Sequence, residues 1–402
     1  MIIGVPRETY PGERRVALIP AAVSTLTKAG LDVLVETDAG SAAGFTDSAY
    51  QDKGAQIGAS RADVFATADI ILQVRTVGAN PEAGRADLEL LRAGQVCIGL
   101  AEPLTSVSAT QALSERTISL FAMEFIPRIS RAQSMDALSS MATVAGYKAV
   151  LLAAERLPKM FPMLVTAAGT IIPARVFIVG AGVAGLQAIA TARRLGAAVE
   201  AYDVRPAAKG HVLSLGAKFV ELPLETQDSE ETSGYAKALG EDFYRRQQEL
   251  LAHVVASSDV VITTAAVPGK SAPVLISEEM VVRMAPGSVI VDLAAERGGN
   301  CALTRPDEVV TTHGVTILGP TNLPATVPQH ASQLYAKNVT SFLLHVLHGL
   351  HGFHGLKEGK LDLESEDPII QSTLVIHAGE VVHPQVREVL GLPPLRCYGR
   401  KG

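Results

Sequence analysis

The sequence has few cysteines, no excess of basic residues and no long apolar run, and each absence excludes a class of protein. Its three cysteines, Cys97, Cys301 and Cys397, lie far apart and lack metal-ligand spacing, so we expect a reducing compartment. A net charge of −6 argues against a basic face that binds nucleic acid. Because no signal sequence and no stretch of about 18 apolar residues occurs, we expect a soluble chain.

What the sequence does contain is a repeated alternation of short apolar strands with helical segments. This alternation predicts an α/β fold of two Rossmann-like domains, each a parallel sheet flanked by helices, with a cleft between them. The pattern breaks at residues 127–136, so we place residues 1–135 and 325–402 in the first domain and residues 136–324 in the second. The expected strands are 2–5, 32–36, 70–74, 95–99, 118–122, 176–180, 199–203, 218–220, 260–264, 288–292 and 315–318, and long helices are expected at 137–157 and 334–347.

A glycine-rich turn at residues 180–185, which we call the glycine turn, lies between an apolar strand and a helical segment. Gly180 allows the tight turn, Gly182 lets the backbone approach a pyrophosphate, and Gly185 lets helix and strand pack closely. Asp203 ends the next strand, where it would accept hydrogen bonds from an adenosine ribose and repel a 2′-phosphate. The pattern predicts an NAD(H) site rather than a bare structural turn, although the nearby Arg205 leaves NADP(H) open. The expected contacts are Gly180, Gly182, Val183, Ala184, Gly185, Asp203, Val204, Arg205, Thr264 and Ala265.

Three other segments of the chain allow more than one interpretation. Residues 227–239, which contain a short acidic run, form either a solvated surface loop or a lid in which Gly234 is flexible and Tyr235 closes over the nucleotide. Polar residues after two strands of the second domain either contact the cofactor or shape the local loops; they are Thr263, Thr264, Pro268, Asp292, Glu296 and Asn300. A histidine at every third position from 345 to 354 suggests a metal site, but glycines and the lack of completing ligands favour a polar helix end, so we expect no metal.

Five stretches resemble the shared scaffold of alanine dehydrogenases and the NAD(H)-binding alpha subunit of proton-translocating transhydrogenases. They are MIIGVPRET at residues 1–9, RRVALIP at 14–20, VETDAGSAAGFTD at 35–47, EEMVVRMAPGSVIVDLA at 278–294 and TNLPATVP at 321–328. Alanine dehydrogenases bind a 2-oxo acid with an arginine that matches Arg15, and they use a lysine and a histidine to protonate it. This chain has Arg75 in place of the lysine, no histidine in CIGLAEP at residues 97–103, and no histidine before His211. The resemblance therefore disfavours alanine dehydrogenase chemistry.

PRISRAQSMDALSS, at residues 127–140, resembles the loop with which transhydrogenases hold the nicotinamide ring, and we call it the nicotinamide loop. The resemblance implies that Arg128, Gln133, Asp136 and Ser139 contact the nicotinamide and its ribose, and that Tyr235 belongs to a mobile lid. Donors and acceptors of this kind match a carboxamide, and a helix that begins early would align the last three on one face. Alternatively, Arg128 pairs with Asp136 and Ser139 caps a helix.

The resemblance implies a reaction in which NADH passes hydride directly to NADP⁺ held by a partner component. No group has to act as acid or base, so the subunit's task is to position the donor ring. The resemblance further implies a homodimer that is cytoplasmic, lies at the periphery of the inner membrane, and couples hydride transfer to proton movement through a membrane-spanning partner. The alternatives are a free-standing alanine dehydrogenase-like enzyme and a non-catalytic NAD-binding regulator.

Overall fold

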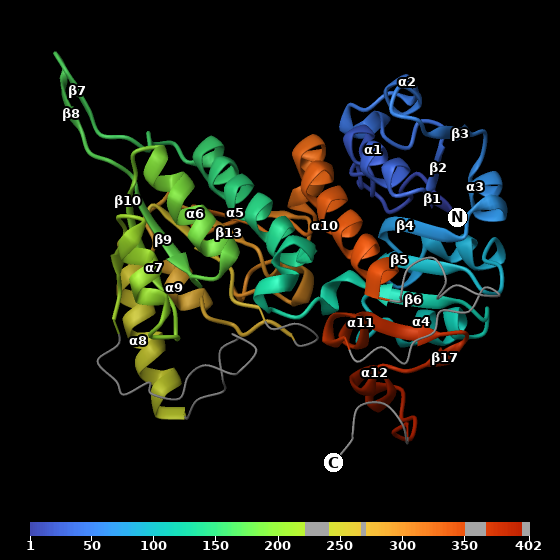
Figure 1. The fold of residues 1–402 in the computed structure, drawn as a ribbon. Helices are drawn as coiled ribbons and strands as arrows, with labels where there is room; N and C mark the ends of the chain where they lie inside the picture. The colour runs from blue at the N-terminus through green and yellow to red at the C-terminus, as the bar shows by residue number, and fades with distance from the viewer. Residues whose placement is uncertain (222–240, 267–270, 350–366, 396–402) are drawn as a thin grey trace. The chain divides into compact units, whose positions relative to one another are not determined.

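The computed structural model describes residues 1–221, 241–266, 271–349 and 367–395. The chain forms two compact units (Figure 1). Unit 1 contains residues 1–141 and 324–402, and unit 2 contains residues 142–323. Each unit is built around its own sheet with helices on both faces, which is the predicted α/β class.

Unit 1 is built on a mixed sheet in the order β17-β16-β6-β5-β4-β1-β2-β3. The strands from β3 to β6 are parallel, while β16 and β17 add an antiparallel edge from the end of the chain. The strands are β1 (Ile2–Val5), β2 (Asp32–Glu36), β3 (Gln56–Gly58), β4 (Ile70–Arg75), β5 (Val96–Leu100), β6 (Ser119–Ala122), β16 (Leu374–His377) and β17 (Glu380–Val381). The helices are α1 (Pro20–Lys28), α2 (Asp47–Gln51), α3 (Arg61–Thr67), α4 (Val107–Ser114), α10 (Pro328–Gly349), α11 (Pro368–Thr373) and α12 (Pro384–Val389).

Unit 2 is built on a sheet in the order β11-β10-β9-β12-β13-β15-β14, parallel except for β14. Apolar residues cover both faces of the central strands, so these strands are buried on both sides. The strands are β9 (Arg175–Val179), β10 (Ala198–Tyr202), β11 (Lys218–Phe219), β12 (Val260–Thr263), β13 (Val289–Asp292), β14 (Val309–Thr312) and β15 (Val315–Leu318). The helices are α6 (Val183–Arg194), α7 (Ala208–Ser214), α8 (Glu241–Ala256) and α9 (Glu278–Val282).

Helix α5 (Ala137–Arg156) begins within the nicotinamide loop and continues into unit 2. Within the described residues it is the one helix long and apolar enough to cross a membrane by length and composition alone. Ala149, Val150 and Ala153 are fully buried in the core of unit 2, as expected for a core helix. Gly146 of α5 packs on α6: a Cβ atom built on it would lie 2.1 Å from the carbonyl oxygen of Ala184.

A β-hairpin that the sequence did not predict follows α5. Strands β7 (Leu164–Thr166) and β8 (Gly169–Ile171) pair antiparallel as a separate two-stranded sheet that projects from unit 2 (Figure 1). Val165 is 76% exposed and Ile172, just after β8, is 79% exposed. A two-stranded hairpin is marginally stable in water by itself, and its apolar side chains here face solvent in the isolated chain.

Candidate nucleotide-binding site

The glycine turn of unit 2 has the geometry that an anion site requires. Gly180 has a φ angle of +99°, which favours glycine, and follows directly on β9. A Cβ atom on Gly185 would lie 1.8 Å from the Gly180 carbonyl oxygen, so only glycine allows this approach of helix to strand. A Cβ atom on Gly182 would meet nothing within 4 Å, so the space before the first turn of α6 is open. The first N–H groups of α6 therefore face open space, as they do in turns that bind a pyrophosphate.

Asp203 follows β10, and its carboxylate contacts both the glycine turn and Arg205. One oxygen accepts a hydrogen bond from the Ala181 N–H at 2.7 Å. Arg205 donates to both oxygens through Nε and Nη2, each at 2.9 Å, and its backbone N–H donates at 2.8 Å. The predicted ribose acceptor therefore also braces the turn, and a ribose hydroxyl would share the carboxylate with Arg205.

The end of β12 supplies a second contact to the turn. The Thr264 hydroxyl donates to the Gly180 carbonyl oxygen at 3.0 Å, and its backbone N–H donates to Val179 at 2.8 Å. Thr263 is fully buried, and its hydroxyl donates to Asp292 at 2.9 Å. Both threonines were expected either to contact the cofactor or to shape the loop. Thr264 lies beside the glycine turn, whereas the Thr263 side chain is directed toward Asp292 on the neighbouring strand β13.

Asp292 ends the next strand, β13, Asn300 follows it, and both are fully buried. They hydrogen-bond the surrounding loops, which is one of the two roles expected for them, whereas Glu296 is exposed. Gly234, Tyr235 and Pro268 lie outside the described residues.

The nicotinamide loop of unit 1 contains a short 3₁₀ helix, η5 (Ser130–Met135), and α5 begins only at Ala137. Gln133 therefore does not share a helical face with Asp136 and Ser139, contrary to the alignment that an early helix start would give. Asp136 accepts hydrogen bonds from the Ser139 N–H at 2.8 Å and the Ser139 hydroxyl at 2.5 Å, so the aspartate caps the helix. Arg128 and Gln133 are exposed, and Asp136 and Ser139 are half-buried.

Two residues from the end of the chain, which sequence reasoning missed, hold the nicotinamide loop. Asn338 of α10 donates through Nδ2 to the Ser134 carbonyl oxygen at 2.9 Å. Asp367 pairs with Arg131 at 3.1 Å and with His345 at 3.0 Å. Within the described residues no group of three or more His, Cys, Asp or Glu could hold a metal, and His351 and His354 of the 345–354 run lie outside those residues.

In unit 1, Arg15, which matches the arginine that binds the substrate in alanine dehydrogenases, forms an ion pair with Glu13. Arg15 is 3% exposed and donates to both oxygens of Glu13, at 2.7 and 2.6 Å. Arg75 also approaches Glu13, at 3.4 Å, and stacks on the Tyr10 ring at 4.2 Å. Burial and then the charge of Glu13 raise the pKa of the Glu8 carboxyl to about 8, although it accepts hydrogen bonds from the N–H groups of residues 74 and 75.

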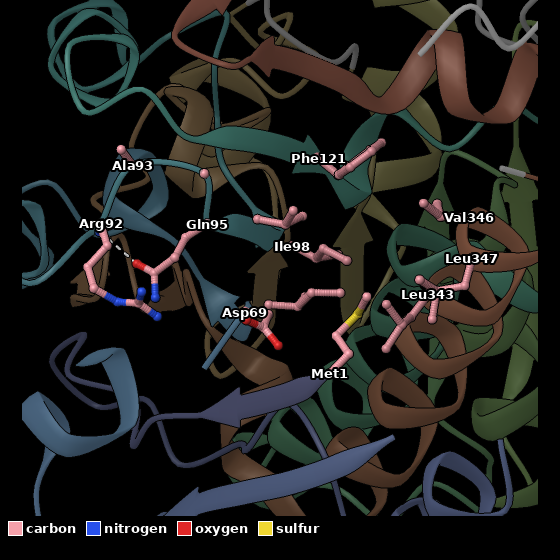
Figure 2. Close-up of a pocket in the computed structure, with 13 residues that line it drawn as sticks. Met1, Asp69, Arg92, Ala93, Gln95, Ile98, Phe121, Leu343, Val346 and Leu347 are labelled. Atoms are coloured by element: carbon pink, nitrogen blue, oxygen red, sulfur yellow. Dashed lines mark hydrogen bonds between the residues drawn. The ribbon is translucent and has the colours of Figure 1, made fainter. Parts of the chain in front are cut away.

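A pocket in unit 1 is lined by none of these residues (Figure 2). It opens at the amino ends of β4 and β5, the edge of the sheet opposite to the one where parallel sheets bind ligands. Its walls are mainly apolar, with Ile98, Phe121 and Leu343 among them. The polar groups of Arg92 and Gln95 donate to the carbonyl oxygens of residues 65 and 68. None of the residues predicted to bind the nucleotide lines this pocket.

Comparison with known proteins identifies the family. The alanine dehydrogenase/PNT N-terminal domain matches residues 4–145, and the alanine dehydrogenase/PNT C-terminal domain matches residues 149–384. The chain belongs to the alanine dehydrogenase/PNT family. The resemblance predicted from the sequence motifs is thereby confirmed.

Among members of the alanine dehydrogenase/PNT family, the transhydrogenase subunits are more similar to this chain than the alanine dehydrogenases. An alpha-subunit chain of the NAD(P) transhydrogenase of Rhodospirillum rubrum is 46% identical over 96% of this chain and 98% of its own length. The alanine dehydrogenase of Methanococcus maripaludis is 29% identical over 98% of this chain and 97% of its own length.

Among solved structures, a transhydrogenase is again more similar to this chain in sequence than an alanine dehydrogenase is, but the two are almost equally similar to it in fold. The transhydrogenase from Sinorhizobium meliloti is 41% identical, with a TM-score of 0.80 over 96% of this chain and 99% of that one. An L-alanine dehydrogenase is 26% identical, with a TM-score of 0.79 over 97% of this chain and 99% of that one. The fold is thus common to both activities, and the discriminating information lies in the side chains.

Proposed function

We propose that this chain is the NAD(H)-binding subunit of a proton-translocating NAD(P) transhydrogenase. The observation that carries the proposal is the glycine turn, with open space at Gly182 before the α6 N-terminus and Asp203 in the position expected for a ribose acceptor. Bound NADH supplies the hydride. The chain's own residues bind the dinucleotide, orient its nicotinamide and exclude water.

In this proposal the nicotinamide loop orients the carboxamide. Arg128 and Gln133 provide exposed donors, and the half-buried pair of Asp136 and Ser139 provides an acceptor and a hydroxyl at the start of α5. Unit 1 lacks the lysine and histidine of the alanine dehydrogenase mechanism, and Glu13 already neutralises Arg15. A reaction without proton transfer at the reacting atoms fits this arrangement better than reduction of a 2-oxo acid does.

The partners follow from the same assignment. NADP(H) is held by a separate component, a membrane-spanning component carries the proton, and this subunit is cytoplasmic and peripheral to the inner membrane through those partners. The transhydrogenase relatives are named as alpha subunits, which supports an enzyme that is incomplete without further components.

The experiment that tests the proposal mixes purified protein, NADH and an acetylpyridine analogue of NAD⁺ with a separately purified NADP-binding component. We expect hydride exchange only when both proteins and NADP(H) are present. Alanine-dependent reduction of NAD⁺ by this chain alone would instead establish an amino-acid dehydrogenase. Nucleotide binding without transfer in either assay would indicate a regulator.

We also propose that the subunit is a homodimer and that the β7–β8 hairpin contributes to the dimer interface. Val165 and Ile172 lie on an uncharged apolar hairpin that would otherwise remain in water, which fits a permanent contact better than a transient one. The variant Val165→Asp/Ile172→Asp should sediment as a monomer while Val309→Asp, an equally apolar exposed position on β14, should not change the mass. A wild-type monomer at micromolar concentration would refute the proposal.

A further inference from the structure

A buried carboxylate connects three segments at the carboxyl ends of β12 and β13. Asp292 is fully buried, and its Oδ1 accepts hydrogen bonds from the Thr263 hydroxyl at 2.9 Å and from the Ala294 N–H at 3.0 Å. Its Oδ2 accepts from the N–H groups of Asn300 and Cys301, at 2.7 and 2.9 Å, and from the Thr304 hydroxyl at 2.7 Å. Five donors around one carboxylate fix the backbone at Asn300.

The Asn300 side chain forms hydrogen bonds with the segment that follows β12. Its Oδ1 accepts from the Ala265 N–H at 3.0 Å, and its Nδ2 donates to the carbonyl oxygens of Ala265 and Pro273, each at 2.8 Å. The amide thus forms hydrogen bonds with both backbone groups of Ala265 and with the carbonyl oxygen of Pro273. A carboxamide suits this position because it presents an acceptor and two donors from one planar group.

Ala265 in turn fixes its neighbour Thr264, which touches the glycine turn. A Cβ atom on Gly180 would lie 2.5 Å from the Thr264 hydroxyl oxygen, so this hydroxyl occupies the space that a side chain at Gly180 would need. The same hydroxyl donates to the Gly180 carbonyl oxygen. A shift of Ala265 therefore reaches the Gly180 backbone through a single residue.

We propose that Asn300 is a positioning residue for NAD(H) binding, because its amide holds Ala265 and Thr264 against the glycine turn. The proposal rests on the proposed function insofar as NAD(H) binds at that turn. Asn300 does not itself have to touch the nucleotide. Its substitution acts on affinity through the shape of the turn, which distinguishes it from a residue that only supports the fold.

The test compares three variants by NADH titration calorimetry and by hydrogen exchange of the nucleotide-free protein. Asn300→Ala should weaken NADH binding by about tenfold, or about 1.4 kcal/mol, because binding must then also restore the order of Ala265 and Thr264 that the amide no longer maintains. It should also speed exchange of the Ala265 amide without nucleotide. Thr304→Ala is the matched control, since it removes one donor to Asp292 but leaves the Asn300 amide contacts, so NADH affinity should stay within about twofold of wild type.

Asn300→Asp should make NADH affinity depend on pH, which a general loss of order in the loops would not do. Its carboxylate would face the carbonyl oxygens of Ala265 and Pro273 and lie next to Asp292, so burial and like charge keep its proton to an unusually high pH. The protonated acid replaces one amide donor. NADH affinity relative to wild type should therefore recover as the pH falls from about 8 to about 5.5, whereas the Asn300→Ala ratio should not change.

Wild-type affinity for Asn300→Ala, an equal loss for Thr304→Ala, or a pH-independent ratio for Asn300→Asp would each overturn the inference. NADH binding by the wild-type protein tests the proposed function. The variant ratios and the nucleotide-free exchange test the role of Asn300, so the two failures are distinguishable.

Discussion

The contact of Gly146 with Ala184 gives a prediction whose sign is opposite to what helix propensity alone would give. In an unconstrained helix, replacing glycine by alanine stabilises the protein by up to about 1 kcal/mol. At Gly146 the new methyl carbon would lie 2.1 Å from the Ala184 carbonyl oxygen, and such contacts essentially never fall under 3.0 Å. Helices α5 and α6 would have to separate by about 0.9 Å at this point.

The two effects can be compared in magnitude. Overpacking of this kind costs about 1–3 kcal/mol, which offsets or exceeds the gain in propensity. Gly210→Ala in α7 is the matched control, because a Cβ atom there would meet nothing within 4 Å. We expect Gly146→Ala to be less stable than Gly210→Ala by about 1–3 kcal/mol. Because Ala184 lies in the first turn of α6, NADH affinity should fall in the first variant only.

Differential scanning calorimetry of both variants, with the transition of unit 2 followed with and without NADH, measures both effects. If Gly146→Ala gains as much stability as Gly210→Ala, the close approach does not constrain the two helices and the reasoning is refuted. Lower stability with unchanged NADH affinity would refute only the link to the nucleotide.

Three further predictions concern unit 1. Because the folded protein keeps the Glu8 proton up to a pKa of about 8, against an ordinary value of 4.5, the free energy of unfolding should fall as the pH rises from 4.5 to 8. In urea titrations, the free energy of unfolding of Glu8→Gln should fall less steeply with pH, and the fall that remains below pH 7 includes Glu124, whose pKa burial raises to about 7. The same steepness as in the wild type would contradict this assignment. Asp136→Asn should slow hydride transfer in stopped-flow measurements far more than it weakens NADH binding, with stability lowered by only about 1 kcal/mol because the amide oxygen still caps α5; equal losses of rate and affinity would argue against a positioning role. Asn338→Ala should accelerate hydrogen exchange around Ser134 and slow hydride transfer, and exchange like that of the wild type would mean that this hydrogen bond does not hold the nicotinamide loop.

The sequence predicted the elements whose signal is local. Most of the parallel strands are short apolar runs, and the glycine turn follows one of them, so the strands expected for both sheets are confirmed to within a few residues. The parallel strand β3, whose sequence QIG is not an apolar run, was missed. Strands β14, β16 and β17 were also missed, because they pair antiparallel with partners that no local pattern specifies. The helix expected at 137–157 is confirmed as α5 (Ala137–Arg156), but no local pattern showed that residues 130–135 form a 3₁₀ turn or that the Asp136 carboxylate caps the helix.

The residues that support the candidate site were the least predictable. Asn338 contacts Ser134 across 204 positions of sequence, and no periodicity connects them. Asp292 and Asn300 were noticed as polar residues after a strand, but their direction could not be derived. A side chain at a strand end points either toward a ligand or toward its own loops, and only the three-dimensional positions of the loop N–H groups decide between the two.

The division of unit 1 along the chain has a consequence for synthesis on the ribosome. Strand β6 pairs on one side with β16, which leaves the ribosome about 250 residues later, and the Tyr335 hydroxyl donates to the Gln73 carbonyl oxygen at 2.7 Å. Unit 2 is contiguous and can therefore finish folding first, although it begins later. Until β16 emerges, the open edge of β6 stays unpaired in the nascent chain and is exposed to wrong pairing. Unit 1, although much of it is translated before unit 2, is thus completed after it.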